Sequence, residues 1–594
     1  MIEQKLTEKT CEAILQLYGK QLTPGSVGLE RTKKGIEGDY TIVVFPFVKI
    51  SRKAPEATAD EIGNYLVQSL PEVASFKVIK GFLNLTLHDN YWLRFLDNRR
   101  NPEFGFAKPR EEDPVVLEYS SPNTNKPLHL GHIRNNLLGF SLAAILKANG
   151  HQVVKVNLVN DRGIHICKSM LAYLKWGNNE TPQSSGLKGD HLIGKYYVLF
   201  NEKYKQEVAS IVALGVKEED AEKQAPLIQE AQEVLRRWEA RDDETIKLWK
   251  LMNSWAYEGF DLTYRKLGVD FDKIYYESDT YLLGKELVGE GVIKGFLEKR
   301  DDGSVWADLR DNGLDEKLLL RSDGTSVYMT QDLGTAQLRY HDFHPSSMIY
   351  VVGNEQNYHF DVLRRILAKL NKEYASHIFH LSYGMVELPQ GKMKSREGTV
   401  VDADDLMEEM IRTAEETTRE LGKVSEFSDI QAEQLFKSIG LGALKYFILK
   451  VDPKKNMLFD PVESIDFNGN TGPFIQYTHA RIRSLISRAV IAGYQLESPL
   501  MDNIEVHPRE REIIRLLAEF PQIIELAGKE MSPALIANYA YELAKEYNQF
   551  YQEVPVLKEQ DGAKVNLRLA LSEMTADVIR KSMSLLGIDV PDKM

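Results

Sequence analysis

Two short motifs of this sequence bring together residue types that act on phosphate groups. His129-Leu130-Gly131-His132 follows an apolar segment, and Gly391-Lys392-Met393-Lys394-Ser395-Arg396 lies far downstream. Imidazoles at the start of a helix can donate hydrogen bonds to a phosphate whose charge grows during in-line displacement. Lysines on a loop can neutralise a polyphosphate as it leaves. Together the motifs predict transfer of an adenylyl group from ATP.

Each motif also has a simpler interpretation. His129 and His132 could be buried structural histidines or metal ligands, although a zinc site needs a third ligand and the neighbouring sequence offers none. The lysine-rich loop could be a solvated charged turn. The glycine between the two histidines, and the strand–turn–helix pattern around them, favour phosphate binding.

The first motif lies inside a strand–helix–strand pattern. Residues 115–119 form a short apolar run, and residues 153–159 form a second one. Between them, a helix from about residue 131 has apolar residues near the 3.6-residue period and ends at Gly150, which suits a left-handed C-cap. Such a unit predicts parallel strands with a right-handed crossover. Ligands bind at the first strand-to-helix turn of such a sheet, which is where His129 lies.

The rest of the chain separates into three regions by pattern. A second strand–helix unit at residues 348–353 and 360–370 extends the central region to a doubly wound α/β domain. A charged helical insertion interrupts this domain at about residues 176–300, and from about residue 405 the pattern is helical. We therefore predict three domains: an α+β domain at residues 1–112, the α/β domain at 113–405 and an all-helical domain at 406–594.

Composition sets wider limits. The 594 residues include only two cysteines, which excludes a disulfide framework or a cysteine-based zinc ribbon and predicts a reducing cytoplasm. No apolar run reaches the length of about 20 residues that a membrane span needs, and the first residues lack the apolar core of a signal peptide. The net charge of −13 argues against a nucleic-acid binder, but only weakly, because phosphate contacts need a local basic surface.

Longer segments around the motifs resemble a known family. The chain resembles the class I aminoacyl-tRNA synthetases and, among these, the arginyl-tRNA synthetases. Residues 129–132 resemble the family's HIGH motif, and residues 392–396 resemble its KMSKS loop. The signal typical of the arginine enzymes is the surround: Glu118-Tyr119-Ser120-Ser121-Pro122-Asn123, Lys126-Pro127-Leu128, Tyr328-Met329-Thr330-Gln331-Asp332, and residues 469–481.

The resemblance implies roles for individual residues. It assigns catalysis to His129, His132, Lys126, Lys392, Lys394 and Ser395, and arginine binding to Glu118, Ser120, Asn123, Tyr328, Asp332 and Gln356. It assigns ATP binding to Pro122, Asn123, Gly131, His132, Asn135 and Met393. Two acidic pocket residues suit arginine, because carboxylates meet the planar fork of guanidinium donors in bidentate geometry. The alternative for Glu118 is a strand-end acid paired with an internal lysine or arginine.

One position departs from the family pattern. KMSKS has a lysine in fourth place, where this chain has Ser395, with Lys394 one place earlier. Members of the family with a degenerate loop carry a lysine just before HIGH, and Lys126 fits that place. We therefore expect Lys126 and Lys392 to flank the phosphates.

The helical region carries the expected RNA contacts. Phe474, Tyr477 and Arg481 follow the i, i+3, i+7 spacing of one helix face. Exposed aromatics and arginine suit unstacked anticodon bases, whereas core packing is the alternative for the two aromatics. The resemblance implies that the N-terminal domain grips the outer corner of tRNA, the Rossmann-like domain does the chemistry and the helical domain reads the anticodon.

The expected activity is attachment of L-arginine to tRNA(Arg) through an arginyl-adenylate. ATP is a substrate, Mg²⁺ accompanies it, no protein-held metal is expected, and the family suggests a monomer whose activation can require bound tRNA. Three rivals stay open: a small-molecule adenylyl- or cytidylyltransferase, a synthetase for another amino acid, and a synthetase-like tRNA-binding protein without catalysis.

Overall fold

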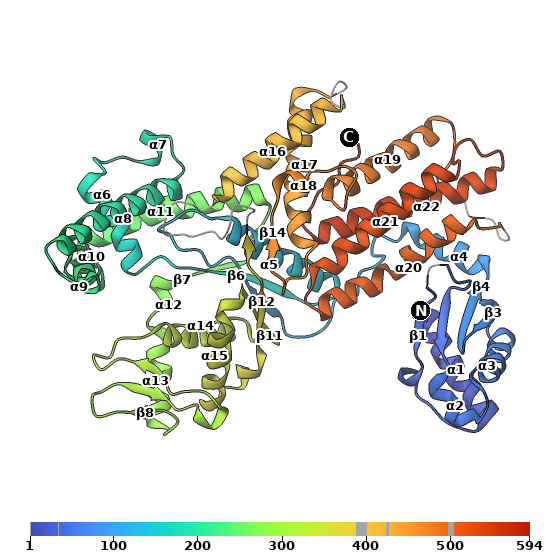
Figure 1. The fold of residues 1–594 in the computed structure, drawn as a ribbon, viewed down its shortest axis with the longest axis horizontal. Helices are drawn as coiled ribbons and strands as arrows, with labels where there is room; N and C mark the ends of the chain where they lie inside the picture. The colour runs from blue at the N-terminus through green and yellow to red at the C-terminus, as the bar shows by residue number, and fades with distance from the viewer. Residues whose placement is uncertain (1, 34, 388–400, 423–426, 497–499, 501–503) are drawn as a thin grey trace. The chain divides into compact units, whose positions relative to one another are not determined.

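The computed structural model describes residues 2–33, 35–387, 401–422, 427–496, 500 and 504–594 (Figure 1). Contacts within the chain divide it into two units. The first contains residues 1–104, 481–520 and 542–579, and the second contains 105–480, 521–541 and 580–594. Helices α19 (Gly472–Ile491), α20 (Pro508–Lys529), α21 (Pro533–Glu553) and α22 (Gly562–Leu585) contribute residues to both.

A five-stranded parallel sheet in the order β12-β11-β5-β6-β7 organises the second unit. The strands are β5 (Val115–Glu118), β6 (Val153–Val159), β7 (Lys273–Tyr276), β11 (Ser347–Gly353) and β12 (Ile378–Tyr383). From central β5 the chain first builds the sheet toward β7 and later returns on the other side with β11. The strand order thus reverses between β5 and β11, and in such sheets ligands bind outside the carboxyl ends of the strands at this point.

Helix α5 (Leu130–Ala148) connects β5 to β6 and carries the first motif at its start. Its buried face includes Ile133, Leu137 and Leu142, which is the periodic pattern that predicted it. The helix ends before Gly150, whose φ of +87° is left-handed and whose Cβ, if present, would lie 2.2 Å from the Lys108 carbonyl oxygen. Only glycine fits this position, so the predicted C-terminal glycine of the helix is confirmed.

The region predicted as a helical insertion at 176–300 is mostly helical, but it also contains strands β7 and β8 (Glu298–Lys299). After α6 (Ile164–Trp176) come α7 (Pro182–Ser185), α8 (Gly189–Ala213), α9 (Glu218–Gln224), α10 (Pro226–Glu239) and α11 (Asp243–Leu267). The chain then returns to the parallel sheet as β7, which pairs with β6. The sequence did not show β7 because this four-residue edge strand mixes charged and aromatic residues.

A smaller layer follows β7. It contains α12 (Glu277–Thr280), α13 (Leu283–Ile293), α14 (Tyr328–Phe343) and a three-stranded antiparallel sheet of β8 (Glu298–Lys299), β9 (Val305–Ala307) and β10 (Lys317–Leu320). Helix α15 (Asn357–Lys369) lies between β11 and β12 in the chain. Short 3₁₀ turns occupy Pro24–Ser26, Asp97–Arg100, Arg310–Asn312, Asn354–Gln356 and Glu373–His377.

Among the described residues after 405, a short strand departs from the all-helical prediction. This region includes α16 (Ala403–Glu420), α17 (Asp429–Leu449) and α18 (Pro461–Ser464), but Met457–Leu458 forms strand β14, which pairs with β13 (Val386–Glu387). A two-residue strand leaves no periodic pattern in a sequence, which explains the miss. Arg134 of α5 holds this pair in place by donating to the carbonyl oxygens of Met385 and Lys455 at 3.1 and 2.7 Å.

The first unit contains a four-stranded antiparallel sheet in the order β1-β2-β4-β3. Its elements are α1 (Ile2–Tyr18), β1 (Leu29–Arg31), β2 (Tyr40–Val43), α2 (Phe45–Ser51), α3 (Pro55–Ser69), β3 (Val73–Ile79), β4 (Phe82–Leu87) and α4 (Asp89–Leu96). Within this unit the sheet contacts α20. Arg511 and Arg515 approach the buried carboxylate of Asp39 at 3.5 and 3.8 Å, and the Leu87 amide also donates to that carboxylate at 2.8 Å.

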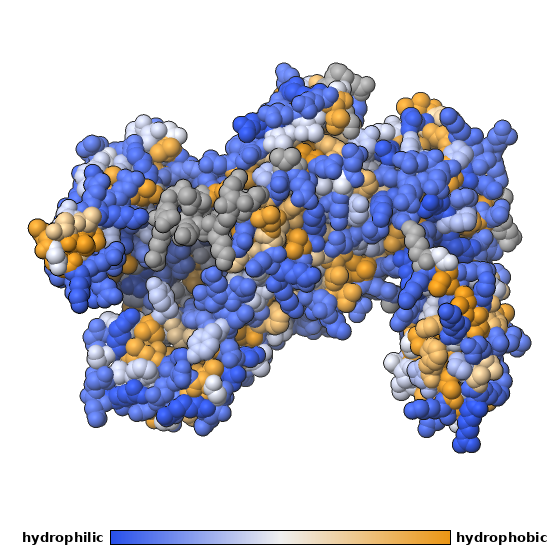
Figure 2. All heavy atoms as spheres, in the orientation of Figure 1, coloured by the Kyte–Doolittle hydropathy of each residue, from blue (hydrophilic) through white to orange (hydrophobic). Residues whose placement is uncertain are grey.

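The visible surface is mostly hydrophilic. Figure 2 shows apolar residues in separate groups on a largely polar face. Among the residues that the structure describes, no helix is both long and apolar enough to cross a membrane.

Candidate active site

The turn at residues 129–132 caps helix α5 with its own histidines. His129 is the N-cap, and its Nδ1 accepts a hydrogen bond from the Gly131 amide at 3.1 Å. The Nδ1 of His132 accepts from the His129 amide at 3.2 Å, and the two ring centres are 4.0 Å apart. Because each Nδ1 accepts a hydrogen bond, these contacts assign the proton of each neutral ring to Nε2.

The surroundings keep both imidazoles neutral. Burial, together with the charge of Lys126, lowers the pKa of His129 to about 4. Burial and the nearby His129 and Lys126 lower the pKa of His132 well below its usual value. At neutral pH each ring therefore presents an Nε2–H donor beside the helix N-terminus, where the helix dipole also favours an anion.

Lys126 lies close enough to both histidines to act on their pKa values. Its own pKa is lowered by burial. The structure therefore brings together the three predicted catalytic residues that belong to the described part of the chain. Lys392, Met393, Lys394 and Ser395 lie outside the described residues. Beyond that gap, the Leu130 amide donates to the Val401 carbonyl oxygen at 3.1 Å.

The turn after β5 has an unusual backbone. Ser120 and Ser121 both adopt positive φ, 82° and 48°, and residues in this region of φ often mark functional sites. The Ser120 hydroxyl lies 2.6 Å from the Tyr264 hydroxyl, so it faces α11. Pro122 is buried and Asn123 half-buried, and Asn123 forms a parallel bridge with Asn160 after β6.

Asn135, predicted to bind ATP, instead connects three strand ends. Its Oδ1 accepts from the Ser120 amide at 2.5 Å, and its Nδ2 donates to the Val351 carbonyl oxygen at 2.7 Å and lies 3.3 Å from the Tyr383 hydroxyl. The side chain is buried and its polar atoms are committed to these contacts. Asn135 thus connects β11, the end of β12 and the turn after β5.

Glu118, predicted to bind arginine, has partners within the protein. It is buried and forms an ion pair with Arg339 of α14, itself only 1% exposed. Its other oxygen accepts from the Ser121 hydroxyl at 3.1 Å. The structure thus favours the alternative interpretation of Glu118 as a strand-end acid paired with an internal arginine.

Two further acidic residues, Asp332 and Glu277, belong to the region that follows strand β7 of the parallel sheet. Asp332 of α14 is half-exposed and its Oδ2 lies 2.5 Å from Nε2 of His359. Glu277, just after β7, was not singled out from the sequence. Burial and the charges of Asp161 and Asp332 outweigh the opposing effect of Arg162 and raise the pKa of Glu277 to about 7. Its position directly after a strand of the parallel sheet could have marked Glu277 as a candidate site residue. The sequence analysis missed Glu277 because it did not predict β7.

Arg162 is a cation beside Glu277, and it has other partners as well. Arg162 Nη1 lies 3.9 Å from Glu277, and its guanidinium stacks 4.0 Å from the Tyr281 ring centre. Arg162 also contacts Glu239 at 3.3 Å. The charge of Asp332 contributes to the raised pKa of Glu277, and a cationic ligand near both carboxylates would favour the ionised form of Glu277. Tyr328 and Gln356, the other predicted arginine ligands, are exposed.

The predicted RNA-binding residues of α19 are half-buried. The Phe474 ring centre lies 5.5 Å from that of Tyr541, and Tyr477 is also half-buried. In the first unit, Arg481 donates to Asn548 and its guanidinium lies 5.5 Å from the Tyr551 ring centre. Each of these side chains is thus partly covered by contacts within the protein. Their contacts with RNA remain predictions.

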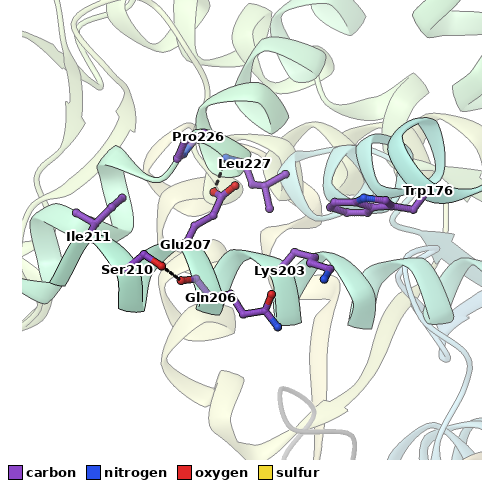
Figure 3. A pocket seen from close by; sticks show the side chains of 8 residues that line it. All are labelled: Trp176, Lys203, Gln206, Glu207, Ser210, Ile211, Pro226 and Leu227. Atoms are coloured by element: carbon purple, nitrogen blue, oxygen red, sulfur yellow. Dashed lines mark hydrogen bonds between the residues drawn. The ribbon is translucent and has the colours of Figure 1, made fainter. Parts of the chain in front are cut away.

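A cavity of about 410 Å³ lies between helices of the insertion. Its lining residues are Trp176, Lys203, Gln206, Glu207, Ser210, Ile211, Pro226 and Leu227 (Figure 3). Glu207 accepts from the Leu227 amide at 2.9 Å at the start of α10, so it serves as a helix cap. None of the predicted site residues lines this cavity, and we assign it no part in the reaction.

Comparison with known proteins extends over the whole chain. The family model described as "tRNA synthetases class I (R), catalytic domain" matches residues 100–460. The models "Arginyl tRNA synthetase N terminal domain" and "DALR anticodon binding domain" match residues 2–87 and 475–594. These matches confirm the predicted fold class, although they do not test the predicted domain boundaries.

Two proteins with similar sequences over their full length are named arginine–tRNA ligases. The arginine–tRNA ligase of Parabacteroides distasonis is 57% identical and that of Bacteroides thetaiotaomicron 58% identical, each covering 100% of both chains. The structure of Thermus thermophilus arginyl-tRNA synthetase matches with a TM-score of 0.79 at 25% identity, again over 100% of both chains. A small-molecule nucleotidyltransferase would not match across all three regions. The chain belongs to the arginyl-tRNA synthetase family of class I aminoacyl-tRNA synthetases.

Proposed function

We propose that this protein attaches L-arginine to tRNA(Arg) in two steps, using ATP. The observation that carries the proposal is the His129–His132 turn, in a chain 57% identical over its full length to an arginine–tRNA ligase. The turn presents two neutral imidazoles at the carboxyl end of the central strand. Their Nε2–H groups are not used by the helix cap and are suited to phosphate oxygens.

In the first step, an arginine carboxylate oxygen attacks the α-phosphorus of ATP. A new oxygen–phosphorus bond forms, the bond to the bridging oxygen of the β-phosphate breaks, and pyrophosphate leaves. His129 and His132 donate to the phosphate oxygens as negative charge builds up. Lys126 lies beside them, and Lys392, Lys394 and Ser395 are proposed to contact the leaving group. Gly131 and the backbone amides of the first turn of α5 complete the anion site.

Arginine selection is proposed to rest on Asp332 and Glu277. A guanidinium between these carboxylates would donate hydrogen bonds in two directions and relieve their repulsion. Tyr328 and Gln356 can approach the same ligand because both are exposed. Asn123 and the strained Ser120–Ser121 backbone are proposed to orient the amino and carboxylate end. Glu118 acts indirectly, by holding Arg339 in the pocket wall.

In the second step, the terminal ribose hydroxyl of tRNA attacks the arginyl carbonyl carbon. The ester forms, AMP leaves, and the hydroxyl proton passes to the departing phosphate. We propose residues 1–112 as a tRNA-corner domain, 113–405 as the catalytic domain and 406–594 as the anticodon-binding domain, with Phe474, Tyr477 and Arg481 at the anticodon. A cytoplasmic monomer whose activation step can depend on bound tRNA is the proposed working form.

Mg²⁺ is expected to arrive with ATP. Among the described residues, Asp190, His191 and Asp404 could together hold a metal ion, but the Lys188 ammonium contacts both carboxylates and supplies their counter-charge. This donor set therefore does not fit a resident metal. Phosphate oxygens are the natural ligands of Mg²⁺ in such sites.

The direct test is aminoacylation of total tRNA with a panel of radiolabelled amino acids. We expect ATP-dependent charging with arginine alone. Charging with another amino acid would keep the class and overturn the pocket assignment. Tight tRNA binding without any charging, and without ATP–pyrophosphate exchange in the presence of tRNA, would show a binding protein that has lost catalysis.

A further inference from the structure

A compact ion-pair cluster lies where helix α8 meets the start of α16. We call Lys188, Asp190, His191, Asp402 and Asp404 the α8–α16 cluster. Nε2 of His191 lies 3.1 Å from Oδ2 of Asp404 and 3.3 Å from Oδ2 of Asp402. Lys188 contacts Asp404 as well and lies 3.2 Å from the fully buried carboxylate of Asp190.

Helix α11 packs against the α8–α16 cluster and donates a hydrogen bond to it. The Lys188 ammonium donates to the Thr263 hydroxyl of α11 at 2.5 Å, and that hydroxyl donates to Asp404 at 3.1 Å. A Cβ at Gly259 would lie 2.3 Å from Oδ1 of Asp190, so the close approach of α11 to α8 requires glycine there. Three elements distant in the sequence thus hold the start of α16.

The start of α16 is in turn hydrogen-bonded to the histidine turn. His129 and Asp402 form an antiparallel bridge. On either side of it, the Leu130 amide donates to the Val401 carbonyl oxygen at 3.1 Å, and the Ala403 amide donates to the Leu128 carbonyl oxygen at 3.0 Å. The backbone of residues 401–403 is therefore a support for the backbone that carries His129.

Asp402 links the α8–α16 cluster to the backbone that supports the His129 turn. Its Oδ1 caps α16 by accepting from the Asp404 amide at 2.8 Å, while its Oδ2 faces His191. The hydrogen bond to Asp404 and the charges of Asp402 and Asp190 outweigh burial and the Lys188 charge and raise the pKa of His191. Burial opposes ionisation of Asp404, but hydrogen bonds from His191 and Lys188 lower its pKa to about 2. The charged pairing is thus the favoured state.

We propose that His191 is a positioning residue for the adenylation step: through Asp402 and Asp404 it fixes residues 401–403, and these fix the backbone of the His129 turn. The inference rests on the proposed function for the role of that turn. It predicts that His191 affects the rate of the chemical step without touching arginine or ATP.

The first experiment compares His191→Leu with His191→Gln in ATP–pyrophosphate exchange with arginine and tRNA. We expect His191→Leu to lower kcat about tenfold, because small misplacements of catalytic groups are costly, with the KM for arginine unchanged. His191→Gln keeps a side-chain amide that can donate to a carboxylate, and should recover most of the rate. His341→Leu, an exposed histidine of α14, is the control and should behave like the wild type.

Asp402→Asn separates the charge from the helix cap. Asparagine caps helices as well as aspartate does but does not carry the charge that faces His191. We expect Asp402→Asn to lower kcat about as much as His191→Leu, and the double variant to be no worse than either, because residues acting through one path are not additive. Additive losses, or an effect confined to the KM for arginine, would overturn the proposal.

Amide hydrogen exchange tests the same coupling without catalysis. In His191→Leu the amides of Leu130 and Ala403 should exchange at least several times faster than in the wild type, while those of β6 stay unchanged. Unchanged protection at both amides would overturn the proposal. If wild-type protein shows no arginine-dependent exchange of pyrophosphate, the proposed function fails, and the amide measurement still decides whether His191 holds the turn.

Discussion

At the scale of single residues, the site depends on how neighbours set the charge of a few side chains. His129 and His132 stay neutral because burial disfavours their cations and Lys126 adds to this effect. Each neutral ring uses Nδ1 for the helix cap and leaves Nε2 as a donor. The same two side chains therefore cap the helix and keep a donor that could bind an anion.

Lys126 should be required for the activation step. It is the lysine that the structure places beside both histidines, and the family's second loop lysine is replaced by Ser395. We expect Lys126→Ala to lower kcat in ATP–pyrophosphate exchange about a hundredfold, the typical loss for one stabilising donor. Lys147→Ala, an exposed lysine at the last turn of α5, is the control. Full activity of Lys126→Ala would show that another lysine supplies the charge.

Glu277 should make arginine binding depend on pH. With a pKa of about 7, it is partly protonated near neutrality, and a guanidinium favours its ionised form. Arginine binding should therefore release protons, and affinity should rise with pH as Glu277 ionises through about 7. Calorimetry in buffers of different ionisation enthalpy measures both effects.

Substitution isolates this side chain. Glu277→Gln should weaken arginine binding about tenfold, equivalent to about 1.4 kcal/mol, and should abolish the pH dependence near 7. Glu286→Gln on the exposed side of α13 is the control. Persistence of the same pH dependence in Glu277→Gln would show that Glu277 is not the group that titrates.

At the scale of elements, the start of α5 leaves no room beside the His129 ring. A Cβ at position 131 would lie 2.9 Å from His129 Cε1 and 3.0 Å from its Nδ1. Gly131→Ala should therefore displace the ring, break its cap and lower kcat by about tenfold to a hundredfold, since misplaced catalytic groups are costly. Gly289→Ala in α13 meets no atom within 4 Å and should keep full activity. Exchange kinetics beside far-ultraviolet circular dichroism distinguish a local from a global effect.

Local pattern explains which elements the sequence predicts well. Strand β6 and helix α5 follow directly from an apolar run and a helical period, and Gly150 marks where the helix stops. Strand β7 is missed because a short edge strand does not need an apolar run. The pairing of Glu118 with Arg339 joins distant parts of the chain, so no local pattern contains it. A local pattern therefore predicts the strand–turn–helix around His129, but it does not predict the partner of Glu118.

At the scale of the whole molecule, a late segment of the chain completes the packing of the second unit. Buried side chains on three helices donate to its carbonyl oxygens. Ser141 of α5 donates to Leu585 at 2.8 Å, Lys445 of α17 to Gly587 at 2.5 Å and Gln476 of α19 to Asp589 at 2.8 Å. Burial lowers the pKa of Lys445 to about 8, so its ammonium depends on this carbonyl contact.

Deleting residues 586–594 should destabilise the second unit strongly. The deletion leaves Lys445 and Gln476 without these acceptors, at about 1–3 kcal/mol for each buried group left unsatisfied. We expect thermal unfolding of the variant to begin at a clearly lower temperature than in the wild type. Deleting only residues 592–594 keeps the three carbonyl groups and should have a small effect. Equal unfolding temperatures for both deletions would show that the contacts contribute little.

The contact between Ser141 and Leu585 also has a consequence for biosynthesis. The two residues are 444 positions apart, so a ribosome has made the histidine turn and the whole parallel sheet long before Leu585 emerges. Domains fold in order as they leave the ribosome, but α5 must wait for its final partner. A nascent chain therefore passes through a stage with its catalytic motif synthesised and its active-site helix incompletely packed, and chaperones that cover exposed apolar surface have their longest opportunity at that stage.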